Sequence, residues 1–68
     1  MSGNRTDAGG EVYFEFTAIG RSVKVSAIDA TTGTEISIIG PVTAARADLQ
    51  RLALQKLQAR LKSSDRKP

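Results

Sequence analysis

The sequence predicts a small α+β domain with the element order β-β-β-α. We expect a three-stranded antiparallel meander, in strand order 1-2-3, with one C-terminal helix packed on one face. Three observations support this fold class. Apolar residues alternate in three short runs within residues 11–41, two turn sequences separate those runs, and residues 44–62 contain neither Gly nor Pro.

The three runs, residues 11–19, 22–29 and 34–39, are rich in aromatic and β-branched residues, as strands prefer. Successive side chains of a strand point to opposite faces, so the alternation predicts one apolar face and one mixed face. The residues expected on the apolar face are Val12, Phe14, Phe16 and Ala18 in the first run, Val23, Val25 and Ala27 in the second, and Ile36 and Ile38 in the third.

The turn sequences predict how the strands pair. Gly20-Arg21 is typical of a two-residue type II′ hairpin, which pairs Ile19 with Ser22. A four-residue loop over residues 30–33, with Gly33 free to adopt positive φ, pairs the residues on either side of it. The two turns together predict the cross-strand rows Phe14–Ala27–Ile36 and Phe16–Val25–Ile38, beneath the helix.

Gly40-Pro41 ends the third strand, and Thr43 is a suitable N-cap for a helix over residues 44–62. The apolar residues of this helix form two stripes, one of Ala45, Leu49 and Leu52 and one of Leu54, Leu57 and Leu61. Because one stripe suffices to cover three strands, one interpretation is that the second stripe contacts another chain. The alternative is one broad buried face with basic side chains along its edge. Apolar residues on the opposite face of the sheet, namely Tyr13, Ile28 and Ile39, complete the predicted protein interface.

The 68 residues are too few for more than one domain. We expect a disordered tail over residues 1–10, the domain over residues 11–62, and a flexible basic tail over residues 63–68. The chain has no Cys and no His, which removes disulfides and the commonest metal ligands, and we expect no cofactor. No apolar run approaches a membrane span and the N-terminus lacks the apolar core of a signal peptide, so we expect a cytoplasmic protein.

Charge is distributed unevenly along the chain. Residues 1–40 contain three basic and five acidic residues, a net charge of −2, whereas residues 41–68 contain seven basic and two acidic residues, a net charge of +5; the sum is +3. A basic C-terminal half can attract nucleic acid or an acidic protein surface, and the alternative is a solvated helix with a soluble tail. The candidate contacts for nucleic acid are Arg46, Lys56, Arg60 and Lys62.

The sequence does not indicate an enzyme. Its serines have no His to activate them, and neither a phosphate-binding loop nor a pocket motif for a small-molecule ligand is evident. The function we expect is a non-enzymatic protein-interaction module, either a homodimer or an adaptor to another protein. The alternative is the weak nucleic-acid binder, which we rank lower because the basic residues of the predicted helix project to different sides.

Four segments in succession, EVYFEFTAIG, SVKV, AIDATTGTE and IGP, resemble a family of short alphaproteobacterial proteins classed as a domain of unknown function. The resemblance covers about residues 11–61. It supports the β-β-β-α fold, and it implies no activity, cofactor, partner or functional residue.

Overall fold

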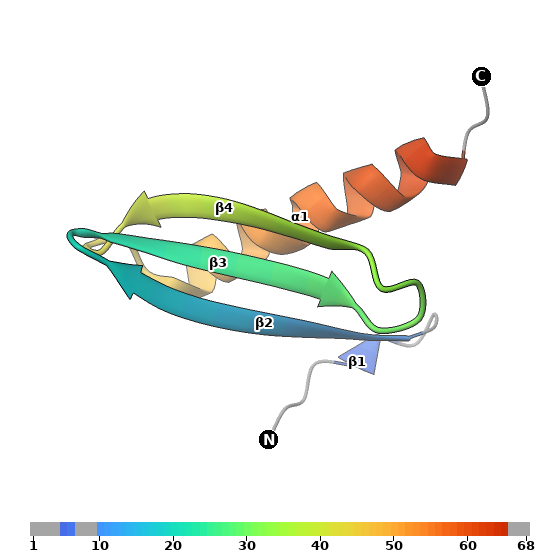
Figure 1. Cartoon of the computed structure of the whole chain (residues 1–68), viewed down its shortest axis with the longest axis horizontal. Helices are drawn as coiled ribbons and strands as arrows, with labels where there is room; N and C mark the ends of the chain where they lie inside the picture. The colour runs from blue at the N-terminus through green and yellow to red at the C-terminus, as the bar shows by residue number, and fades with distance from the viewer. Residues whose placement is uncertain (1–4, 7–9, 66–68) are drawn as a thin grey trace.

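The computed structural model describes residues 5–6 and 10–65, which form one antiparallel sheet with a helix on one face (Figure 1). The strands are β1 (Arg5–Thr6), β2 (Gly10–Ile19), β3 (Ser22–Asp29) and β4 (Glu35–Pro41), in the spatial order β1-β2-β3-β4, and the helix is α1 (Arg46–Asp65). The predicted meander corresponds to β2, β3 and β4, and both it and the C-terminal helix are confirmed.

The structure adds the two-residue strand β1, which pairs with the beginning of β2. It falls in the segment that we expected to be an N-terminal tail. The other residues of that segment, apart from Gly10 at the start of β2, lie outside the described part of the chain, as do residues 66–68 of the expected C-terminal tail.

The predicted register between β2 and β3 is confirmed. Ile19 pairs with Ser22, and this pairing places Phe16 opposite Val25 and Phe14 opposite Ala27. Gly20 has φ +60°, while Arg21 has no positive φ, as a type II′ turn requires. A change of one residue in register would move every side chain to the other face, so the turn and the alternation of the strands support the same pairing.

The register between β3 and β4 is also as predicted, with Ala27 opposite Ile36 and Val25 opposite Ile38. The Asp29 N–H donates to the Thr34 carbonyl at 2.8 Å, and Gly33 has φ +81°. The buried Asp29 carboxylate accepts hydrogen bonds from the Thr32 N–H at 2.9 Å and from the Thr32 hydroxyl at 2.7 Å. This carboxylate therefore stabilises the turn, in the manner of an Asx turn.

The helix begins at Arg46, two residues later than expected, and the prediction of Thr43 as its N-cap is wrong. The Ala44 N–H donates to the Pro41 carbonyl at 3.0 Å, so residues 41–44 form a turn. Thr43 lies within this turn and not at the start of the helix. The Ala45 carbonyl then accepts the first helical hydrogen bonds, from the N–H groups of Asp48 and Leu49. At its other end, α1 extends to Asp65, three residues beyond the expected end, and no Gly or Pro interrupts it.

The core contains few side chains. Val25, Ala27 and Ile36 of the sheet are buried against three residues of α1, which are Leu49, Ala53 and Leu57. Ala27 and Ala53 are both fully buried, and their small side chains allow the helix to approach the sheet closely. The helix packs mainly on β3 and β4.

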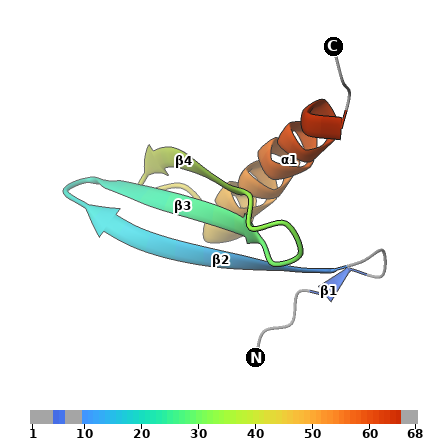
Figure 2. The same cartoon turned by 45° about the vertical axis from the view of Figure 1, so that its right-hand side comes forward.

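The predicted rows lie on the helix side of the sheet, but their β2 members are only half-buried. Phe14 and Phe16 pack against the edge of the core. They are not fully beneath the helix, because α1 crosses over the two other strands of the meander. The C-terminal turns of α1 run out past β4 and beyond the sheet (Figures 1 and 2).

Candidate protein-interaction surface

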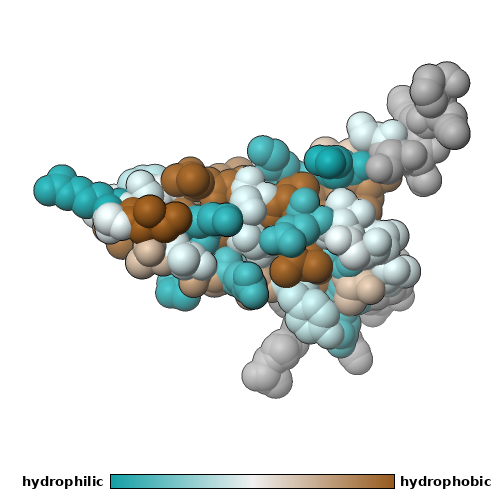
Figure 3. Space-filling view, viewed as in Figure 1, coloured by the Kyte–Doolittle hydropathy of each residue, from teal (hydrophilic) through white to brown (hydrophobic). Residues whose placement is uncertain are grey.

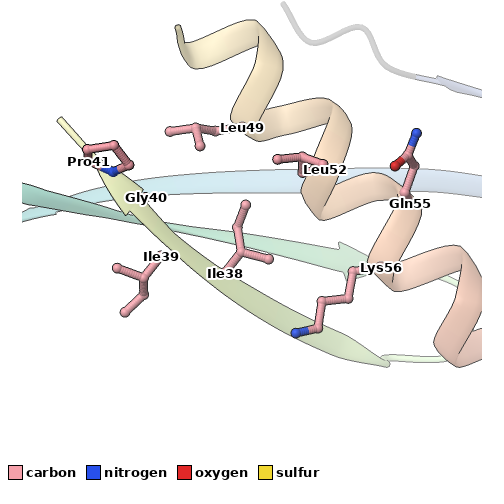
Figure 4. A pocket seen from close by; sticks show the side chains of 8 residues that line it. All are labelled: Ile38, Ile39, Gly40, Pro41, Leu49, Leu52, Gln55 and Lys56. Carbon is pink, nitrogen blue, oxygen red and sulfur yellow. The ribbon is translucent and has the colours of Figure 1, made fainter. Parts of the chain in front are cut away.

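An open apolar groove lies between β4 and α1, with a volume of about 570 Å³. Figure 4 shows Leu49 and Leu52 reaching from the helix towards the strand, with the Lys56 side chain extending across it. Most of the lining is aliphatic, and the polar groups come from Gln55 and the end of Lys56. The residues that line the groove are Ile38, Ile39, Gly40, Pro41, Leu49, Leu52, Gln55 and Lys56.

The shape of the groove depends on Gly40. A Cβ atom at this position would lie only 2.6 Å from Cδ2 of Leu49, so the leucine packs directly on the strand's backbone. Leu49 is almost completely buried and belongs to the core. Leu52, three residues further on, remains 51% exposed and forms a wall of the groove.

The groove runs beside the free edge of β4. Among the described residues, β4 pairs with β3 alone. Hydrogen-bonded and non-hydrogen-bonded pairs alternate along an antiparallel ladder. The bonds from Asp29 to Thr34 and from Val42 to Arg21 fix which residues of β4 bond to β3. These are Ile36, Ile38 and Gly40, so the backbone N–H and C=O groups of Glu35, Ser37 and Ile39 point outward.

Pro41 fits this alternation. It pairs with Ser22 at a position whose N–H would point away from β3, so its missing N–H removes no bond from the ladder. A proline at the end of an edge strand also limits how far another strand can pair with it. The outward hydrogen-bonding groups are therefore confined to residues 35–39 and the Pro41 carbonyl.

Large apolar side chains are exposed around this edge. Ile39 in β4 is 65% exposed, Val42 just after β4 is 56% exposed, and Leu52 of the groove is 51% exposed. We call these three residues, with the outward backbone groups of β4, the β4-edge surface. Two other exposed apolar residues, Tyr13 and Ile19, lie on the outer face of β2. In Figure 3 the apolar side chains of the outer face are interspersed with hydrophilic ones.

The structure buries the leucines of the predicted interface to different degrees. Leu57 is fully buried in the chain's own core, so its assignment to a surface stripe is wrong. Leu61 is half-buried against the core, and Leu54 is also half-buried. The buried line of the helix, through Leu49, Ala53 and Leu57, combines members of both stripes, which is closer to the alternative of one broad buried face.

The other predicted interface residues, Tyr13, Ile28 and Ile39, lie on the outer face of the sheet, as expected. Only Ile39 adjoins the groove. Sequence reasoning missed Leu52, which we had placed in the core-facing stripe, and Val42. The signals that could have found them are Gly40-Pro41, which marks an edge strand with a close helix approach, and the position of this strand last in the meander.

The candidate nucleic-acid contacts do not gather on one surface. The guanidinium of Arg46 lies over the Phe16 ring, 4.3 Å from its centroid, on the β2 side of the helix. Lys56 lines the groove on the β4 side, and Arg60 and Lys62 are exposed on the C-terminal turns. A further basic residue, Arg51, pairs with Asp48 at 2.8 Å in an exposed ion pair, which contributes little to stability.

One hydrogen bond joins the titratable side chains Tyr13 and Glu11. Tyr13 donates a hydrogen bond to a carboxylate oxygen of Glu11 at 2.6 Å, and this bond, together with the carboxylate's charge, raises the pKa of Tyr13 above its ordinary value of 10.0. Both side chains are exposed, and neither lines the groove between β4 and α1. Within residues 5–6 and 10–65, no group of three His, Cys, Asp or Glu side chains could hold a metal ion.

The fold and this surface define a small α+β domain with an open sheet edge beside an apolar groove. The chain belongs to the family described as Domain of unknown function (DUF6898), whose model matches residues 9–64. This match confirms the resemblance to a domain of unknown function. No curated protein and no solved structure matches the chain. In the part of the chain that the structure describes, no helix has both the length and the apolar character needed to cross a bilayer.

Proposed function

We propose that this chain is a non-enzymatic protein-interaction module and that it binds its partner through the β4-edge surface. The observation that carries the proposal is the coincidence of two features at one place. An unpaired strand edge offers backbone hydrogen bonds, and the adjoining groove of about 570 Å³ offers apolar contacts. Extended segments that add a strand to a sheet use both, because main-chain bonds supply affinity and neighbouring pockets supply specificity.

Exposure of apolar residues supports the same proposal. Scattered apolar residues are normal on a protein surface, but contiguous ones beside a groove are typical of binding sites. Ile39, Val42 and Leu52 are each more than half exposed, and Ile39 and Leu52 both line the groove. Unpaired strand edges of natural proteins are usually protected by charge, by proline or by a covering segment. Here Pro41 protects only the end of β4.

Two further parts of the proposal rest on the sequence. A cytoplasmic location is supported by the absence of cysteine. An alphaproteobacterial source is supported by the resemblance of residues 11–61. Nucleic-acid binding stays the second candidate, supported only by the net charge of +5 after residue 40, and no contact of the described residues favours it over protein binding.

Site-specific photo-cross-linking in the cell that expresses the chain tests the proposal. A photoreactive phenylalanine analogue replaces Leu52 in one variant and Gln58 in a matched control. Both positions are exposed on α1, but only Leu52 lines the groove. We expect a discrete cross-linked protein from position 52, identified by mass spectrometry, and little or none from position 58.

The cross-linked protein, once purified, should bind the wild-type chain and bind the Ile39→Asp variant roughly tenfold more weakly or worse, because a buried apolar anchor is replaced by a charge. Ile39 is 65% exposed in the free chain, so the substitution should leave the fold intact, as circular dichroism will show. Equal cross-linking from both positions, or unchanged affinity of the Ile39→Asp variant, would contradict the proposed surface.

A further inference from the structure

We propose that the partner of the β4-edge surface is a second copy of this chain, with β4 paired antiparallel to the partner's β4 about a two-fold axis at Ser37. This inference rests on the proposed function and specifies its partner. The β4–β4 pairing joins the sheets of two chains edge to edge into one continuous sheet.

The backbone of β4 is self-complementary in this register. Its outward N–H and C=O groups belong to Glu35, Ser37 and Ile39, which are spaced two residues apart. With the axis at Ser37, that residue pairs with its own copy, and Glu35 pairs with the partner's Ile39. Every outward N–H between residues 35 and 39 then has a carbonyl acceptor, and Pro41, which has no N–H, lies outside the paired segment.

Side chains on the helix side match as well. Ile38 is half-buried at the groove, and in this register it lies opposite the partner's Ile36. These residues form a non-hydrogen-bonded pair, in which side chains approach most closely. The pairing therefore covers the half-buried Ile38 with another isoleucine.

The outer face is compatible with the same register. Ser37 already shares a hydrogen bond of 3.0 Å with Ser26 of β3, so small hydroxyl side chains meet at the axis. Ile39, which is 65% exposed, gains a neighbour in the aliphatic part of the partner's Glu35. No two like charges are brought directly opposite each other.

Charge complementarity favours a second copy over an unrelated strand. Lys24 pairs with Ile39 across β3 and β4, and in the dimer the next residue in that row is the partner's Glu35. Lys24 and the partner's Glu35 are thus two strands apart, about 10 Å between backbones, which a lysine and a glutamate can bridge above Ile39. Symmetry produces this ion pair twice. Among the described residues, neither Lys24 nor Glu35 has an ion-pair partner within its own chain.

The position of α1 also favours the addition of a strand at the β4 edge. The C-terminal turns of α1 run out past β4, so a strand beside β4 lies below them rather than in open solvent (Figures 1 and 2). The two-fold axis brings the partner's α1 across the groove side, where Leu52 is 51% exposed. A domain this small is stabilised marginally by its own core, and a partner subunit is one of the usual means of reinforcement.

Charge exchange on purified protein tests the proposal. Glu35→Lys places a lysine beside the partner's Lys24, and Lys24→Glu places a glutamate beside the partner's Glu35. Both residues are exposed, so each variant should fold like the wild type. By sedimentation velocity, the wild type should dimerise in the micromolar range, and each variant should dimerise roughly tenfold more weakly, since two ion pairs become two repulsions.

The association of a mixture of the two variants is the decisive measurement. In the mixed dimer every Lys24–Glu35 contact again joins opposite charges, so association should return to near the wild-type level and weaken with added salt. Restoration on mixing cannot arise from a general effect of either substitution on stability. Wild type that stays monomeric up to high micromolar concentration overturns the proposal, as does dimerisation that neither substitution weakens.

Proline substitution at the two sheet edges locates the contact. Ser37→Pro removes an outward N–H of β4, whereas Ala18→Pro removes an outward N–H of β2 and serves as the matched control. We expect only Ser37→Pro to abolish the dimer. Loss of the dimer in Ala18→Pro alone would assign the contact to β2 and overturn the proposal. If Ser37→Pro does not fold by circular dichroism, the charge-exchange arm decides.

Failure of the dimer proposal can be distinguished from failure of the proposed function. If position 52 cross-links to a different protein in the cell while the purified chain remains monomeric, the β4-edge surface is a binding site and the second copy is not its occupant. If position 52 cross-links no more than position 58 and the chain is monomeric, both proposals fail.

Discussion

Replacement of two leucines on the same helix tests the core most directly. Leu57→Ala removes a side chain that is fully buried, while Leu52→Ala removes the same atoms from a side chain that is 51% exposed in an open groove. Both positions lie in the interior of α1, so the change in helix propensity is the same for both substitutions and cancels in the comparison. The difference between the two free energies of unfolding therefore reports burial alone.

The magnitudes follow from the two environments. A buried Leu→Ala change costs about 2.7–5.0 kcal/mol, because a cavity adds to the lost transfer energy. Leu57 is fully buried in the core between the sheet and α1, so we expect its loss to cost about 3–4 kcal/mol of unfolding free energy. At Leu52, the substitution removes one methine and two methyl groups, which at about 0.8 kcal/mol each, with half of the area already exposed, amount to about 1 kcal/mol. No cavity forms there because the groove is open to solvent.

Urea unfolding followed by circular dichroism measures both values, at a low protein concentration where a dimer is dissociated. A domain of this size has a total stability of roughly 3–10 kcal/mol, so Leu57→Ala should remove at least about a third of it and lower the urea midpoint strongly. Leu52→Ala should remain folded with a small decrease in midpoint. Equal losses at the two positions, or a larger loss at Leu52, would refute the orientation of α1 on the sheet.

Three other outcomes are expected. Gly40→Ala should lower the free energy of unfolding by about 1–3 kcal/mol by overpacking against Leu49. The double variant with Leu49→Ala should lose less stability than the sum of the two single losses, and full additivity would mean that the two residues do not touch. Tyr13, the chain's single tyrosine, should titrate above pH 10.0 by phenolate absorbance, and Glu11→Ala should lower that midpoint. Because the folded-state pKa is raised, the hydrogen bond's small contribution to stability is present below the unfolded pKa and is lost as the pH rises through the folded pKa. Anisotropy titrations with RNA and DNA should stay flat at physiological salt, and tight salt-dependent binding that Arg60→Ala abolishes would favour the nucleic-acid alternative.

The strand pairing could be predicted from the sequence because two local signals are mutually consistent. Gly20 provides the positive φ that a two-residue hairpin needs, and the alternation on either side of it permits only one register. The turn at Gly33 is similarly local. Both signals depend on residues a few positions apart, whose conformations are limited by steric rules that act within the turn itself.

The helix boundaries were less predictable. Thr43 has the chemistry of an N-cap, but the turn that follows Pro41 occupies it, and the helix begins at Arg46. The Ala44 N–H donates instead to the Pro41 carbonyl at 3.0 Å. Sequence propensity alone does not decide between two such local arrangements.

The sequence by itself determined the order β2-β3-β4-α1, the two turns and the register of these three strands. The tertiary structure alone decided which side of the helix is buried. An apolar arc as wide as that of α1 permits several rotations about its axis, and the rotation adopted depends on how two alanines, Ala27 and Ala53, allow close packing over β3 and β4. That packing buries Leu57, leaves Leu52 exposed beside the β4 edge and forms the groove, because contacts between distant residues, rather than helical periodicity, select the buried face.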